Sequence, residues 1–248
     1  MPAARTRRRL LAAAALLIAL GGLAFTASAR LPARGGAAAR PAPPAGSGGV
    51  AGTGSQNRPL VPQVSLAGLR WSGFYGVELP SSVVAGPRET RGGTAAGFAR
   101  SPLGALLAAV NIGVRANAQW GPAIFAAVIR GQVTGPGAAA LLADCQTSYA
   151  QASQSEGVTG GQPLGDVEVT EEAFRWVIYT PAAAVIDLVS AGPGGQGTTV
   201  RASTQIQAVW DDGDWKVIAP PGGNWGNSAT ELSSLSGYTI FPGQGGGR

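Results

Sequence analysis

Three aspartates surround one glycine in the stretch "WDDGDWKVIAPP", residues 210–221, and carboxylates this close together could hold a cation. A calcium loop of the EF-hand type needs oxygen ligands at alternating positions over about twelve residues, closed by a glutamate. Here the acids end at Asp214, and a tryptophan follows. Asp212 and Gly213 instead form the pair typical of a two-residue type I′ hairpin, in which both residues take a positive φ. The stretch therefore predicts a turn and no metal site.

This turn also determines which residues face each other across the hairpin. It places Asp211 opposite Asp214 and Trp210 opposite Trp215. The tryptophans then share the core face, and both aspartates lie on the solvent face. Like charges at a hairpin end are tolerated in water because their repulsion is small there. The acidic cluster therefore carries information about folding and none about catalysis.

Other residue types that could do chemistry are scarce. The chain has no histidine, the usual general base near neutral pH, and its single cysteine, Cys145, falls on the apolar stripe of a predicted helix. Asp187 alternates with Val185 and Val189 in a predicted strand. It is either an acid in the concave face of the sheet or an ordinary edge or solvent-facing side chain. We predict no catalytic, cofactor-binding or metal-binding residue, and no cofactor.

The net charge of +5 over 248 residues is unevenly distributed. Residues 1–67 contain eight arginines and no acid, whereas residues 68–243 contain nine basic residues and all 13 acids, a net of −4. The basic character belongs to the N-terminal segment, and no basic stripe marks the remainder. We therefore expect no direct contact with nucleic acid.

The N-terminal segment predicts a membrane anchor. The basic residues 1–9 precede an uncharged apolar run, residues 10–29, which as a helix would span about 30 Å, the thickness of a bilayer core. A retained transmembrane helix would leave residues 1–9 in the cytoplasm and the C-terminal domain outside, in a single-pass protein of the cell membrane. Ala27 and Ala29 also fit cleavage of a signal peptide after Ala29, which would release a secreted protein. Both interpretations stay open.

Composition divides the rest of the chain. Residues 30–67, rich in proline, glycine and alanine, predict a disordered linker, and residues 244–248 predict a flexible tail. Between them, residues 68–243 predict one extracytoplasmic α+β domain. Three helices are expected, the first capped by Ser101 with Pro102 in its first turn, the second begun by Pro122 and the third within residues 135–153. Four segments rich in β-formers follow, at residues 171–180, 182–192, 198–212 and 214–221.

These segments predict three helices packed on one face of a curved four-stranded antiparallel sheet. Residues 198–212 alternate most clearly, as expected of a half-buried strand. One face would carry Val200, Ala202, Thr204, Ile206, Ala208 and Trp210, and the other Arg201, Ser203, Gln205 and Gln207.

A membrane helix, a linker, "GFARSPLGALLAAVN" and, later, "VWDDGDWKVIAPP" follow one another in this order. This arrangement resembles actinobacterial membrane-anchored proteins and the single-span assembly proteins of type IV secretion and conjugal transfer. Their extracytoplasmic domain is a nuclear-transport-factor-like (cystatin-like) cone. The resemblance implies a non-catalytic scaffold that contacts other membrane or secretion-system proteins or a further copy of itself. It carries over no catalytic residue.

Two other functions stay open beside the scaffold. One is an extracytoplasmic module that binds a ligand. The other is an isomerase or dehydratase of the cone fold, in which Asp187 with Tyr149 or Tyr179 would have to replace the usual pairs. For the scaffold, Trp120 and Trp225 are the expected partner contacts, because tryptophan is enriched at interfaces. The alternative for each is that it closes an open end of the cone.

Overall fold

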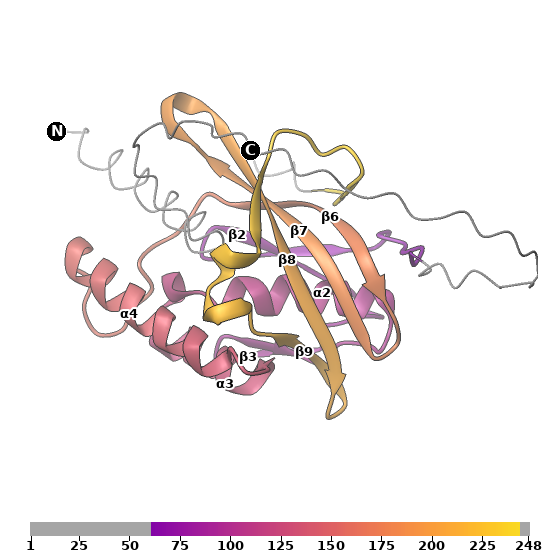
Figure 1. The fold of residues 1–248 in the computed structure, drawn as a ribbon, viewed down its shortest axis with the longest axis horizontal. Coiled ribbons are helices and arrows are strands. Elements are labelled where there is room, and N and C mark those ends of the chain that lie inside the picture. Colours follow the sequence, from indigo (N-terminus) through magenta and orange to yellow (C-terminus); the bar gives the residue numbers. More distant parts are fainter. Residues whose placement is uncertain (1–60, 244–248) are drawn as a thin grey trace, which may run out of the picture.

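The structure is a computed structural model that describes residues 61–243 (Figure 1). The predicted span at residues 10–29 and most of the predicted linker lie outside the described residues. Within residues 61–243, none of the helices has the length and apolar character needed to cross a membrane.

The main sheet of the described chain has seven strands, in the order β11-β6-β7-β8-β9-β5, with β10 paired to β8. Four of them are long and antiparallel: β6 (Thr170–Tyr179), β7 (Ala183–Pro193), β8 (Thr199–Asp211) and β9 (Asp214–Ile218). Three are short: β5 (Val133–Thr134), β10 (Ala229–Leu232) and β11 (Thr239–Ile240). The sheet is mixed because β5 runs parallel to β9.

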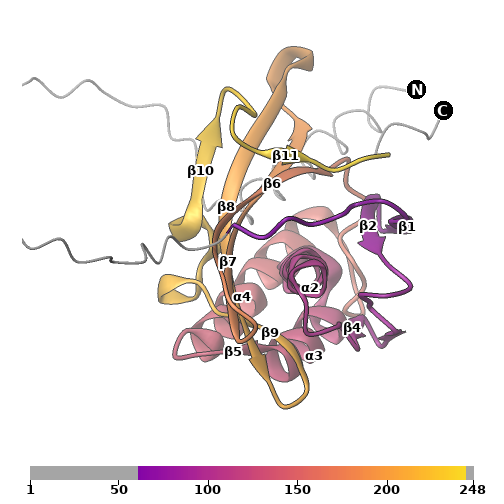
Figure 2. The same ribbon diagram turned by 90° about the vertical axis from the view of Figure 1, so that its right-hand side faces the viewer.

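Two separate hairpins precede the helices. They are formed by β1 (Arg70–Phe74) with β2 (Val77–Ser81), and by β3 (Glu89–Arg91) with β4 (Thr94–Ala96). Figure 2 shows these strands on the opposite side of helix α2 from the main sheet. The N-terminal part of the domain therefore forms a layer of its own.

The expectation of a four-stranded antiparallel cone is wrong. The described residues contain three α-helices, as well as the seven-stranded mixed sheet and the two small hairpins. The difference arises because β5, β10 and β11 are only two to four residues long, and each pairs with a distant strand. Strands this short carry no alternation that a sequence pattern could detect.

Helix α2 (Pro102–Arg115) lies at the centre of the domain, between the sheet and the N-terminal hairpins (Figure 2). Its start is as predicted, because the Ser101 side chain accepts a hydrogen bond from the Gly104 amide at 3.1 Å. Every residue from Gly104 onwards is buried. Gly104 is required for close approach, since a Cβ there would lie 1.9 Å from the carbonyl oxygen of Ala99. Its sequence fits this burial, because Asn111 and Arg115 are the only polar side chains in the helix.

The other two helices, α3 (Pro122–Gln132) and α4 (Ala138–Glu156), follow α2 in the chain and pack against each other. Helix α4 buries Leu141, Cys145 and Tyr149 on one face, and its other residues are partly or fully exposed. Short 3₁₀ turns connect the elements: η1 (Ala118–Trp120), η2 (Gly195–Gly197), η3 (Pro221–Gly223) and η4 (Trp225–Ser228).

We call the side of the main sheet that packs on α2 the inner face, and the opposite side the outer face. The C-terminal segment, residues 219–241, runs from the end of β9 over the outer side of the sheet to the edge of β6 (Figures 1 and 2). The alternation predicted for β8 is observed, with Ile206 and Ala208 buried and Gln205 and Gln207 exposed. The outer face therefore carries the polar half of β8.

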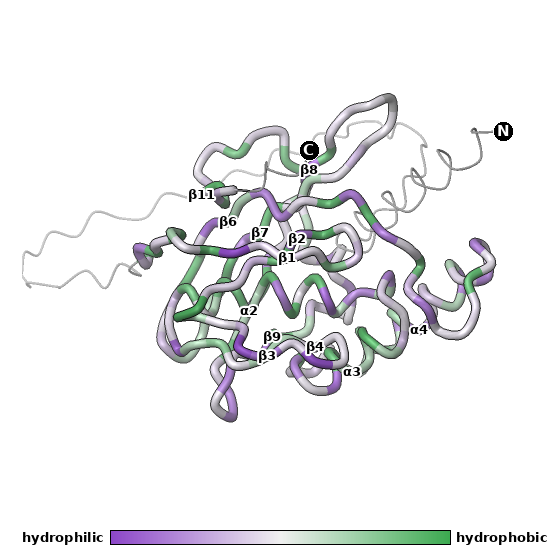
Figure 3. The backbone as a smooth tube through the Cα atoms, turned by 180° about the vertical axis from the view of Figure 1, so that it is seen from behind, coloured by the Kyte–Doolittle hydropathy of each residue, from purple (hydrophilic) through white to green (hydrophobic). Residues whose placement is uncertain are grey.

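The hairpin between β8 and β9 has the predicted register, with Trp210 opposite Trp215 and Asp211 opposite Asp214. Asp212 has φ 50° and Gly213 has φ 80°, as a type I′ turn requires. Figure 3 shows the hydrophilic tip of this hairpin projecting from the domain.

The prediction that Asp214 faces solvent is wrong. Its carboxylate accepts hydrogen bonds from the backbone N–H of Gly97 at 2.7 Å and of Phe98 at 3.0 Å. The Trp215 indole is buried and donates to the Ala99 carbonyl at 2.9 Å. Asp214 and Trp215 together therefore hold residues 97–99, which lead into α2, against the hairpin.

Candidate functional site

The space between helices and sheet is filled by side chains. Trp120 is 1% exposed and donates its indole N–H to the Val114 carbonyl at 2.6 Å. Trp225 is 3% exposed and donates to the Ala116 carbonyl at 3.4 Å. Both indoles bond to the C-terminal end of α2, because its last carbonyls lack helical partners. The expectation that these two tryptophans are exposed partner contacts is therefore corrected, since both belong to the core.

Asp187 lies on the outer face, on the central strand β7. Its carboxylate accepts from the Arg175 guanidinium at 2.6 Å and from the Gln205 amide at 3.2 Å. These three residues are register neighbours on β6, β7 and β8. The hydrogen bond to Asp187 raises the pKa of Arg175 above its ordinary value. Asp187 is thus one member of a neutral, hydrogen-bonded ion pair.

The tyrosines considered as partners of Asp187 lie elsewhere. Tyr149 is on α4 and donates its hydroxyl to the Gln162 carbonyl at 2.7 Å. Tyr179 ends β6, where its ring contacts Trp176. The structure therefore does not bring an Asp–Tyr pair together at Asp187.

A different tyrosine, Tyr238, does lie at this site, although the sequence pattern did not single it out. The Arg175 guanidinium lies 4.6 Å from the centre of its ring. Its hydroxyl donates to the Ser203 hydroxyl at 3.1 Å. Tyr238 thereby fastens the C-terminal segment to the outer face of the sheet.

Between this segment and the sheet lies a hollow of about 590 Å³, which we call the outer-face groove. Its floor is the outer face of β6, β7 and β8, and its wall is formed by residues between η3 and the start of β11. The lining consists of Arg175, Asp187, Ser203, Gln205, Gln207, Pro221, Asn227, Ser228, Ala229, Thr230, Leu232, Ser234, Ser236 and Tyr238. The groove is therefore rich in amides and hydroxyls.

Several of these polar side chains are free to bind a ligand. Within residues 61–243, the side chains of Gln207, Ser228, Thr230 and Ser236 form no hydrogen bond with another residue. Gln207 and Thr230 are both exposed. Gln207 comes from β8 in the floor of the groove, and Thr230 comes from β10 in its wall. The groove can therefore offer hydrogen bonds from at least two sides.

One buried carboxyl group lies on the inner face. Glu171 is 2% exposed and accepts hydrogen bonds from the Ser190 hydroxyl at 2.9 and 3.0 Å. Burial raises its pKa from 4.5 to about 7. Simple alternation from Phe174 would place Glu172 inward instead, but a β-bulge inserts Glu172 as an extra residue and turns Glu171 into the core. The sequence pattern missed this residue because a bulge leaves no periodic signal.

Arg115, at the end of α2, is also buried. Its guanidinium carbon lies 4.2 Å from the centre of the Phe74 ring, and its Nε and Nη1 have no hydrogen-bond partner among the described residues. Burial lowers its pKa to about 10. The Phe74 ring face is the interaction that the structure provides for this cation.

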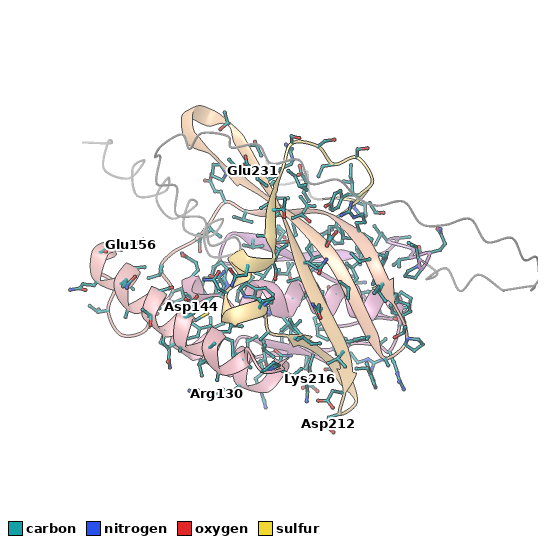
Figure 4. The ribbon with its side chains drawn as sticks, in the orientation of Figure 1. Arg130, Asp144, Glu156, Asp212, Lys216 and Glu231 are labelled. Atoms are coloured by element: carbon teal, nitrogen blue, oxygen red, sulfur yellow. The ribbon has the colours of Figure 1, made fainter. Side chains whose placement is uncertain are left out.

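The remaining groups do not form a reactive cluster. Burial raises the pKa of the Cys145 thiol to about 12, and the charge of Asp144 adds to the shift. Cys145 is thus the inward, unreactive thiol that the helical stripe predicted. Figure 4 shows the charged residues Glu156 and Asp212 at opposite ends of the domain, on α4 and at the hairpin tip. Nowhere in residues 61–243 do three or more acidic or cysteine side chains gather as metal ligands would.

Comparison with protein families gives one match, to the family described as "Domain of unknown function (DUF8175)", over residues 32–240. This match covers most of the chain, so the chain belongs to that family. The comparisons with curated proteins and with solved structures gave no match.

Proposed function

We propose that this member of the DUF8175 family is a non-catalytic extracytoplasmic scaffold that recognises its partner through the outer-face groove. The observation that supports this role is the contrast between the two sides of the sheet. The inner face packs against α2, which is buried from Gly104 onwards, whereas the outer face leaves a hollow of about 590 Å³ lined by polar side chains. Unpaired polar groups that converge in one hollow are typical of a binding surface.

A binding role explains the titratable groups better than catalysis does. Both carboxylate oxygens of Asp187 already accept hydrogen bonds, one from Arg175 and one from Gln205. Glu171 is buried in the core, away from the groove, and Cys145 points from α4 into the core of the domain. Neither Glu171 nor Cys145 lines the groove.

The proposed setting is the cell surface. The apolar run at residues 10–29 would hold the chain in the membrane, and the linker at residues 30–67 would let the domain reach a partner. The resemblance in the order of parts supports an assembly role in a conjugation or secretion apparatus. The partners would then be other membrane proteins of that apparatus, or a second copy of the chain.

An extracytoplasmic ligand-binding module is the second candidate. The volume of the groove favours it, because about 590 Å³ lies in the range of pockets that bind small molecules. The two functions share one surface and differ in what occupies it.

The test is capture of the full-length protein from its own membranes after chemical crosslinking. Wild type should recover membrane or channel subunits of a secretion system. The double variant Gln207→Ala/Thr230→Ala should recover much less, while Gln151→Ala, an exposed glutamine on α4, should behave as wild type. Equal recovery by all three proteins would refute the assignment of the groove.

A further inference from the structure

We infer that the outer-face groove binds an uncharged oligosaccharide, an inference that rests on the second candidate function, the extracytoplasmic ligand-binding module. Three properties of the groove lead to this class of ligand: its neutral charge, its free hydrogen-bonding groups, and its position on the face of the sheet instead of the edge.

The two charged side chains that line the groove, Arg175 and Asp187, are paired with each other. Both Nε and Nη2 of Arg175 donate to one oxygen of Asp187, at 3.2 and 2.6 Å. Next to them on the outer face, Arg201 pairs with Glu172 at 2.6 Å. A charged ligand would have to compete with these ion pairs for their hydrogen bonds. The groove therefore favours a ligand without charge.

The groups that remain free are an amide and several hydroxyls. Gln207 can donate and accept at once, and so can the hydroxyls of Ser228, Thr230 and Ser236. A sugar hydroxyl is also both donor and acceptor. It can therefore either donate a hydrogen bond to these side chains or accept one from them. The half-buried ring of Tyr238 adds rigid apolar surface at the border of the groove. Amides, hydroxyls and one aromatic ring match the surface of a sugar.

A peptide ligand fits this surface less well. Peptides that bind a sheet through their main chain add a strand to an unpaired edge. The floor of the groove is the face of β6, β7 and β8, and the backbone groups of β7 are paired with β6 on one side and β8 on the other. Recognition on this floor therefore depends on side chains.

The test uses the purified full-length protein and four soluble probes, with binding measured by titration calorimetry and ligand-observed NMR. Cellotetraose and chitotetraose are the uncharged oligosaccharides, tetragalacturonate is the charged one, and pentaglycine is the peptide. We expect at least one uncharged oligosaccharide to bind with a Kd of about 1 mM or tighter, and the other two probes to bind more weakly.

The variants then locate the binding site. Gln207→Ala and Thr230→Ala should each weaken binding about tenfold, the effect of one lost hydrogen bond, and Gln151→Ala on α4 should leave it unchanged. Because both groove residues are exposed, we expect the variants to fold normally, and an unchanged melting temperature would verify this. Retained affinity in both groove variants would overturn the assignment of the site.

Failure of the inference is distinguishable from failure of the proposed function. If neither uncharged oligosaccharide binds, or if pentaglycine or tetragalacturonate binds more tightly, the oligosaccharide assignment is wrong. The scaffold role would still stand if groove variants lose their membrane partners. Conversely, sugar binding together with undiminished partner capture would support the oligosaccharide and refute the scaffold role of the groove.

Discussion

The inner and outer faces of the main sheet are built from the same strands but have opposite properties. On β8, Ile206 and Ala208 are buried against the helical side, while Gln205 and Gln207 between them are exposed on the outer side. The inner face is closed by α2, which is buried along almost its whole length. The outer face is closed only in part by the C-terminal segment, and the groove lies beneath it.

This difference separates the residues that stabilise the fold from those available for recognition. A fully buried aromatic or aliphatic side chain contributes about 1.5–3 kcal/mol through removal from water. An exposed polar side chain contributes little, and exposed ion pairs contribute about 0–1 kcal/mol. Substitutions on the inner side should therefore change stability, and substitutions of the exposed, unpaired side chains in the groove should change binding alone.

The largest effect on stability is expected at Trp215 in the β8–β9 hairpin. Trp215→Ala should reduce the free energy of unfolding by roughly 3–5 kcal/mol, because it removes a fully buried indole and its bond to the Ala99 carbonyl. Chemical denaturation measures this loss. Trp210→Ala, at the half-buried partner, should cost clearly less. A loss below about 1 kcal/mol at Trp215 would contradict the core assignment.

Glu171, on the inner face, should make the free energy of unfolding of the domain depend on pH. Its pKa is about 7 when folded and 4.5 ordinarily, so between these values the folded state holds a proton that the unfolded state has lost. The free energy of unfolding should therefore fall as pH rises from about 4.5 to 7, by about 3 kcal/mol in total, and be flat above.

Glu171→Gln should remove this slope, so that the variant gains stability over wild type at pH 8 and not at pH 4.5. Denaturation at a series of pH values tests it, with the exposed Glu231→Gln as the control. Parallel pH profiles for wild type and Glu171→Gln would show that the buried carboxyl does not bind a proton in this range.

Asp214 and Asp212 offer a matched pair within one hairpin. Asp214→Asn should cost about 1–3 kcal/mol, because an amide has one acceptor oxygen for the three backbone N–H groups that the carboxylate now accepts. Asp212→Asn should be nearly neutral, since Asp212 is exposed and asparagine tolerates its positive φ. Equal melting temperatures for the two variants would mean that Asp214 does not anchor residues 97–98.

The smallest effect on stability is expected in the groove. Gln207→Ala/Thr230→Ala should change the free energy of unfolding by less than about 0.5 kcal/mol per site, as is usual for exposed residues whose side chains bond to no other residue. Urea denaturation checks this. A larger loss would show that the outer face also carries folding energy, and the separation of the two faces would fail.

Local signals in the sequence predicted the helix start at Ser101, the hairpin register and the alternation of β8, because each depends on neighbours in the chain. Interactions between distant residues were not predictable. Asp214 accepts a hydrogen bond from a backbone amide that is 117 residues away in the sequence. The pairing of β10 with β8 likewise leaves no pattern in the sequence of either strand. At Glu171, a single bulge turns into the core a side chain that simple alternation along β6 would place outside.

The groove was missed for the same reason. Gln205, Gln207 and Ser203 were predicted on the solvent side of β8. The structure places all three on the outer face, where Gln205 and Gln207 are exposed but Ser203 is buried and bonded to Tyr238. What makes them a site is the C-terminal segment, which Tyr238 fastens over the sheet from 35 residues away. A serine-rich loop gives no indication in the sequence of the strand that it will cover.

Site-specific photo-crosslinking of the full-length protein in its own membranes tests the central claim most directly. A photoreactive residue would replace Gln207 in the groove, Thr230 on its wall, or Arg91, which is exposed on β3 on the far side of α2. The account predicts adducts from Gln207 and Thr230 and none from Arg91. Adducts from Arg91 with none from the two groove positions would contradict it.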